Sequence, residues 1–119
     1  MLLALKRAGW MSRIRELSGR LSSKCIKEFG ESEAAPKLRI YFGGADALWI
    51  SDGEAKVRGV EEGGFYKFWE ASEFSDYASP EEMLNDDSKM AKAKSVEVIY
   101  GDRRKTFHSW KEFIQWLEE

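Results

Sequence analysis

Apolar residues recur with a helical period before Pro36 and with a period of two after it. Upstream, spacings of seven, four, three, four and four put six residues on one side of a helix: Leu3, Trp10, Ile14, Leu17, Leu21 and Cys25. Downstream, Leu38, Ile40 and Phe42 alternate with polar positions, which is typical of a strand with one buried face. Residues 31–36 follow neither period and end in proline, so we expect a linker there. The sequence therefore predicts a basic amphipathic helix over residues 1–30 and a domain over residues 37–119.

Two glycine-containing pairs predict hairpins in this domain. Asp52-Gly53 separates the alternating segments 47–51 and 54–60, and the pair favours a type I′ turn because it tolerates positive φ. Gly101-Asp102 separates the segments 96–100 and 103–108 in the same way. Together with the strand around Ile40, these hairpins predict about five antiparallel strands, arranged as a three-stranded meander and a C-terminal hairpin.

Two capping boxes predict where helices begin. Ser79-Pro80-Glu81-Glu82 combines a cap residue, a proline at the first helical position and an acidic residue three positions after the cap. We expect its helix to bury Met83, Leu84 and Met90 and to end within residues 89–94. The second box, at Ser109, starts a terminal helix whose apolar face holds Trp110, Phe113, Ile114 and Leu117. Strands in runs, with helices between the runs, predict an α+β fold with helices packed on an antiparallel sheet.

Aromatic residues are concentrated between Gly63 and Glu82. Phe65, Phe68 and Trp69 have helical spacing, so we expect them on the buried side of a helix. Tyr66, Phe74 and Tyr77 point elsewhere and are candidates for a partner-binding surface, because protein interfaces are enriched in such rings. Stacking of nucleic acid on this stretch is disfavoured by the acidic residues around it, which are Glu61, Glu62, Glu70, Glu73 and Asp76.

Residues that enzymes use for chemistry are scarce. His108 is the only histidine, and no nucleophile accompanies it. Cys25 is the only cysteine, so it forms no internal disulfide, and burial on the helix would make its thiol inert. The acidic residues near Asp86 lack the spacing of a calcium loop, and Gly43-Gly44 lacks a phosphate-loop pattern. We expect no catalytic residues, no metal site and no cofactor.

Positive charge is concentrated in the N-terminal helix. Residues 1–30 contain seven lysines and arginines against two glutamates, although the whole chain has a net charge of −2. The helix could pack on the chain's own sheet, with its basic flank against the acidic remainder, or lie on anionic lipid. It could also form a homodimer through Trp10, Ile14, Leu17 and Leu21. A fourth alternative is contact with phosphates of nucleic acid through Arg13, Arg15, Arg20 and Lys27.

Size and composition favour a small binding protein. The chain has 119 residues, enough for one domain, it has no apolar run long enough to span a membrane, and we do not expect it to be secreted because Lys6 and Arg7 interrupt its first apolar run. With one cysteine, a reducing compartment suits it best, so we expect a cytoplasmic protein, and its size favours a microbial or phage origin. We expect a non-catalytic binding or regulatory protein that acts through protein–protein contacts. The alternative is a nucleic-acid-associated protein that uses the basic helix.

Overall fold

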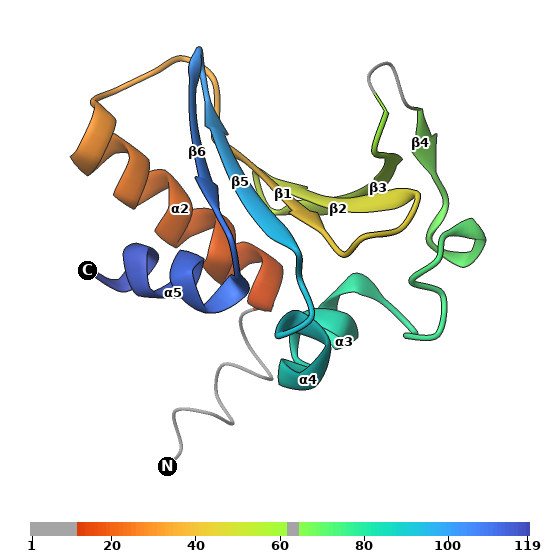
Figure 1. Cartoon of the computed structure of the whole chain (residues 1–119). Coiled ribbons are helices and arrows are strands. Elements are labelled where there is room, and N and C mark those ends of the chain that lie inside the picture. The colour runs from red at the N-terminus through yellow and green to blue at the C-terminus, as the bar shows by residue number, and fades with distance from the viewer. Residues whose placement is uncertain (1–11, 62–64) are drawn as a thin grey trace.

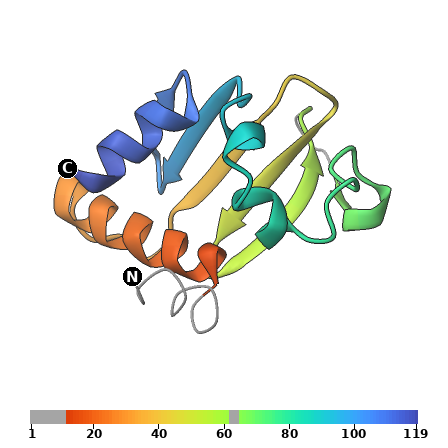
Figure 2. The ribbon, with the colours of Figure 1, turned by 90° about the horizontal axis from the view of Figure 1, so that it is seen from below.

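The fold is a six-stranded antiparallel sheet with helices on one side (Figure 1). The computed structural model of the chain describes residues 12–61 and 65–119. In chain order the elements are α2 (Arg13–Phe29), β1 (Lys37–Tyr41), β2 (Asp46–Ser51), β3 (Glu54–Gly59), β4 (Tyr66–Lys67), the 3₁₀ helix η1 (Trp69–Ala71), α3 (Pro80–Leu84), α4 (Asp87–Met90), β5 (Ser95–Tyr100), β6 (Arg103–Phe107) and α5 (Trp110–Glu118). Seen from below, the helices lie in front of the strands (Figure 2). The predicted α+β class is confirmed.

The strand order is β4-β3-β2-β1-β5-β6, so β1 joins the predicted meander to the predicted C-terminal hairpin. Leu38 of β1 lies opposite Ile50 on one side and Val98 on the other, which aligns the apolar positions of three strands. The turn between β2 and β3 has positive φ at both Asp52 (52°) and Gly53 (80°), as a type I′ hairpin requires. The sixth strand, β4, was not predicted and pairs with β3 through only two residue pairs.

The core lies between the sheet and the helices. The sheet contributes fully buried residues from every long inner strand: Leu38, Ile40, Leu48, Ile50, Val57, Val96 and Val98. The two long helices cover them with Leu17, Leu21, Cys25, Trp110, Phe113, Trp116 and Leu117. Helix α2 is thus docked on its own sheet, as one of the four sequence alternatives proposed.

Docking of α2 excludes the predicted use of its apolar side as a free dimer face. Leu17 is 3% exposed and Leu21 is 1% exposed, so neither side chain is available to a second copy. Ile14 is half-buried against the same core. Trp10, the fourth residue of that prediction, lies outside the described residues. The dimer prediction is wrong for Leu17 and Leu21 because the sheet needs the same apolar stripe to complete its own core.

The aromatic stretch differs most from the sequence prediction. It forms β4, η1 and turns in place of a helix, and Phe65 and Phe68 are 76% and 82% exposed, so their assignment to the core is wrong. Phe74 is 1% exposed, so its assignment to a partner surface is also wrong. Its ring packs against those of Phe42 and Trp69, at centroid distances of 5.6 and 6.1 Å. Pairing with β3 holds the backbone of Tyr66 and Lys67 extended, so successive side chains point to opposite faces of the sheet and do not form one helical face.

An ion pair between the partly exposed Lys67 and a buried carboxylate links this stretch to the sheet. Asp46, at the start of β2, lies 2.7 Å from the Lys67 ammonium, and its second carboxylate oxygen accepts a bond from the Glu73 backbone N–H (3.0 Å). The Glu73 carboxylate in turn accepts from the Asp46 N–H (2.8 Å). A Cβ on Gly44 would overlap the Glu73 carboxylate, so a larger residue there would displace the side chain that accepts from the Asp46 N–H.

The capping boxes begin helices as predicted. The Ser79 and Ser109 hydroxyls accept bonds from the backbone N–H groups of Glu82 and Glu112. The single helix expected after Ser79 is two short helices, α3 and α4, because Asp86 caps a new helix by accepting from the N–H groups two and three residues on. Met83, Leu84 and Met90 are buried as expected.

Candidate functional site

The second face of the sheet carries no helix within the described residues (Figure 1). Strand alternation and the pairing register identify the side chains that point away from the helices. We call them the open face: Lys37, Arg39, Tyr41, Ala47, Trp49, Ser51, Glu54, Lys56, Arg58, Tyr66, Ser95, Glu97, Ile99, Arg104 and Thr106. Most of its cations and all of its rings lie on strands β1 to β4.

The centre of the open face is a cross-strand row. Arg39 of β1 lies opposite Trp49 of β2, and Trp49 lies opposite Lys56 of β3. In the neighbouring row, Arg58 of β3 lies opposite Tyr66 of β4. Side chains directly opposite on one face of a sheet are within contact distance, so each ring of these rows has a cation beside it.

Cation–π contacts link these rows. The Arg58 guanidinium lies 5.2 Å from the Trp49 ring centroid and 4.9 Å from that of Tyr66. The Lys56 ammonium lies 4.8 Å from the Tyr66 ring, and the Arg39 guanidinium lies 5.6 Å from the Tyr41 ring. Such contacts hold long cationic side chains along the rings and leave their charge near the surface.

Charge on the open face is opposite in sign to that of the whole chain. Its basic residues are Lys37, Arg39, Lys56, Arg58 and Arg104. Its carboxylates are Glu54, opposite Ser51 at the start of β3, and Glu97, which lies 3.3 Å from Arg104 on the β5–β6 side. The part formed by β1 to β4 is therefore positive, although the chain has a net charge of −2.

A shallow hollow of about 170 Å³ lies on this positive part. Trp49, Ser51 and Tyr66 line it together with three cations and with Asp52 and Glu54 at the hairpin end. The indole N–H of Trp49 is buried and has no acceptor among the described residues. Pockets that enclose small molecules are usually about 300 Å³ or larger, so this hollow suits one group of a longer ligand.

Among the residues predicted to bind a partner, Tyr66 belongs to the open face and is 57% exposed. The others that the structure describes do not gather around this face. Tyr77 is half-buried, and its hydroxyl donates to Asp86 (2.7 Å), which raises the pKa of the phenol. Phe74, Leu17 and Leu21 are in the core.

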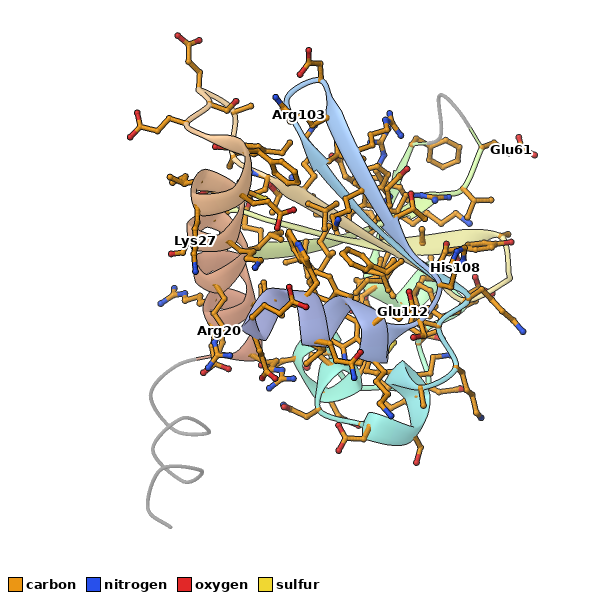
Figure 3. All side chains as sticks on the ribbon, turned by 60° about the vertical axis from the view of Figure 1, so that its left-hand side comes forward. Arg20, Lys27, Glu61, Arg103, His108 and Glu112 are labelled. Atoms are coloured by element: carbon orange, nitrogen blue, oxygen red, sulfur yellow. The ribbon has the colours of Figure 1, made fainter. Side chains whose placement is uncertain are left out.

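Helix α2 lies on the helix-covered side of the sheet, with Arg15 near Gly53 of the β2–β3 turn, and acidic residues accompany some of its cations. Arg13 is 3.8 Å from Glu16, and Arg20 is 3.7 Å from Glu118 at the end of α5. Arg15 is exposed. Figure 3 shows Arg20 and Lys27 on the outer side of α2. The structure therefore does not bring the predicted phosphate-binding residues of α2 together with the rings of the sheet.

Sequence reasoning missed Lys37, Arg39, Trp49, Lys56 and Arg58 as a group. A signal was present, because they occupy the polar positions of three alternating segments. Those segments are separated in sequence, and only the strand register shows that their polar positions meet on one face.

His108 and Cys25 are the two residues that the sequence singled out for possible chemistry. His108 is exposed, and its backbone N–H donates to the Glu112 carboxylate (3.4 Å), close to which it lies in Figure 3. Burial raises the pKa of the Cys25 thiol to about 11, so it stays protonated. No group of three or more histidine, cysteine, aspartate or glutamate side chains within residues 12–61 and 65–119 could hold a metal ion. None of the helices in these ranges is long and apolar enough to cross a membrane.

Comparisons with protein-family models, with curated proteins and with solved structures find no match to this chain.

Proposed function

We propose that this protein is a non-catalytic binding protein that engages an anionic partner through the open face of its sheet. The observation that carries the proposal is the row Arg39, Trp49 and Lys56, in which two cations flank an aromatic ring on a face that the described helices leave uncovered. Aromatic rings give contact area, and cations give electrostatic attraction to an anion.

A binding role is favoured over catalysis. The Cys25 thiol is buried and protonated, so it is a poor nucleophile, and the His108 side chain is exposed to solvent. The buried state of Cys25 also suits a cytoplasmic protein, which is where we place this chain.

The open face is favoured over helix α2 as the binding surface. Carboxylates accompany Arg13 and Arg20, and Lys24 lies 3.9 Å from Glu28 and contacts the Glu119 carbonyl. These carboxylates reduce the attraction of α2 for another anion. On β1 to β4, cations outnumber carboxylates, and the rings accompany them.

Removal of three positive charges from the open face is expected to weaken binding of a polyanion about tenfold at low salt. The variant is Lys37→Gln, Arg39→Gln and Lys56→Gln, and the measurement is the Kd for fluorescein-labelled heparin by fluorescence anisotropy. The matched control, Arg20→Gln, Lys27→Gln and Lys111→Gln, makes the same change in net charge at exposed positions of α2 and α5. It is expected to bind like the wild type.

Two results would contradict the proposal. One is that the wild-type protein does not bind heparin even at low salt. The other is that the control variant loses as much affinity as the open-face variant, which would assign the effect to net charge or to α2. A circular dichroism spectrum of each variant establishes that it is folded.

A further inference from the structure

We propose that the anionic partner is a single-stranded nucleic acid that lies across strands β1 to β4 of the open face. The inference rests on the proposed function and specifies its ligand. A nucleic acid single strand presents planar bases and phosphates in alternation, and proteins that bind it combine aromatic platforms with cations. The open face offers both kinds of group in alternation, with Tyr66, Arg58, Trp49 and Arg39 following one another from β4 to β1.

Tyr66 is the ring best placed for stacking. Its side chain is 57% exposed, at the edge of the sheet, and it lines the hollow opposite Trp49. Among the described residues, the cross-strand partner of Tyr66 is the cation Arg58. Its ring lies 4.8 Å from the Lys56 ammonium and 4.9 Å from the Arg58 guanidinium. These two cations place positive charge beside the ring, which counters the electrostatic objection that sequence alone raises against stacking here.

The hollow between these rings suits one base. Its volume of about 170 Å³ is too small for a typical enclosed small-molecule site, but a shallow recess beside a ring accepts a flat group. Trp49 contributes a second ring to the lining of the hollow, together with Tyr66.

A folded acidic protein fits this face less well. The centres of protein–protein interfaces are depleted in lysine, whereas Lys37 and Lys56 line the hollow itself. A duplex also fits less well, because its bases are stacked on one another and offer no free face to Tyr66 or Trp49.

Carboxylates set the limits of the proposed binding tract. Glu97 ends the central row on β5, where it pairs with Arg104, and Asp52 and Glu54 lie at the β2–β3 turn. The positive surface is therefore the part over β1 to β4, and we place the strand there.

The test measures binding of labelled oligothymidylate and oligouridylate of about 12 nucleotides, a length within the range that single-strand-binding folds cover. The duplex of the same length, labelled heparin and labelled poly-glutamate are the competing probes. Fluorescence anisotropy of wild-type protein is expected to show tighter binding of the single strands than of the other three. Comparison of the two oligonucleotides distinguishes DNA from RNA as the source.

Tyr66→Ala is expected to weaken single-strand binding about tenfold, because stacking of one base on an aromatic ring is lost. Tyr66→Phe keeps the ring and is expected to bind like the wild type. Heparin has no bases, so its affinity should be unchanged in Tyr66→Ala, which also shows that the face is still folded.

The Lys37, Arg39 and Lys56 triple glutamine variant should make the dependence of log K on log salt shallower by about 2, because three phosphate contacts are lost.

Other outcomes separate this inference from the proposed function. Equal affinity for heparin and single strands, with no effect of Tyr66→Ala, would overturn the nucleic-acid inference and leave a polyanion-binding face. Tighter binding of poly-glutamate, lost in the triple variant, would identify an acidic protein as the partner. Absence of binding to every probe would overturn both proposals.

Discussion

Replacement of Lys67 by methionine is expected to lower the free energy of unfolding by about 3 kcal/mol at pH 7. Asp46 is 2% exposed, and Lys67 is its cationic partner at 2.7 Å. Methionine leaves the Asp46 carboxylate buried without that charge, and the cost of an uncompensated buried charge exceeds the cost of losing both partners. Urea unfolding followed by circular dichroism measures the change. Lys111→Met, at an exposed position of α5, is the control and should change the free energy by less than about 0.5 kcal/mol.

The pH dependence of this effect follows from the pKa of Asp46. Burial alone would raise the pKa of the carboxyl, but the bonds from Lys67 and from the Glu73 backbone outweigh burial and hold it below its usual value. In the wild type, the resulting stability is present at neutral pH and is lost as the pH falls through this lowered pKa. In Lys67→Met, burial dominates and raises the pKa, so protonation of Asp46 relieves the buried charge as the pH falls. The difference between the two proteins should therefore shrink from pH 7 towards pH 4.

An unchanged difference between pH 7 and pH 4 would contradict this explanation. The loss of stability would then come from packing of the lysine side chain and not from its charge. A loss no larger than that of Lys111→Met would show that the ion pair contributes nothing measurable.

Local signals predicted most of the elements of this fold. The Asp52-Gly53 turn, the Ser79 and Ser109 caps and the alternation through Ile40 each depend on residues close in sequence, and the structure has the corresponding hairpin, helices and strand. The apolar stripe of α2 also predicted a helix. The surface against which this helix packs, however, depended on whether the sheet presented a matching apolar face. That is a property of the whole core and cannot be deduced from the helix alone.

Non-local pairing explains what the sequence did not predict. Strand β4 consists of two residues, and it exists because Tyr66 and Lys67 pair with Arg58 and Val57. Sequence neighbours suggested an acidic environment for Tyr66, whereas its cross-strand neighbours are cations. The candidate site was missed for the same reason, since cations that are close in sequence drew attention to α2 and those of the open face come from separate strands.

Phe74→Ala is expected to lower the free energy of unfolding by about 4 kcal/mol, because removal of a buried ring leaves a cavity. Phe74 is 1% exposed and packs against Phe42 and Trp69. Phe68→Ala is the matched control: the same substitution six residues away, at a side chain that is 82% exposed, should change stability by less than about 0.5 kcal/mol. Equilibrium urea unfolding of both variants measures the contrast.

This pair of variants decides between two descriptions of the aromatic stretch. The helical spacing of the sequence puts Phe68 in the core and Phe74 on the surface, and the pairing of β4 with β3 reverses that assignment. A larger loss of stability in Phe68→Ala than in Phe74→Ala would support the helical description. It would contradict the pairing that places Tyr66 beside Arg58. A larger loss of stability in Phe74→Ala would therefore support the strand arrangement on the β4 side of the open face. It would also support the proposed stacking position of Tyr66.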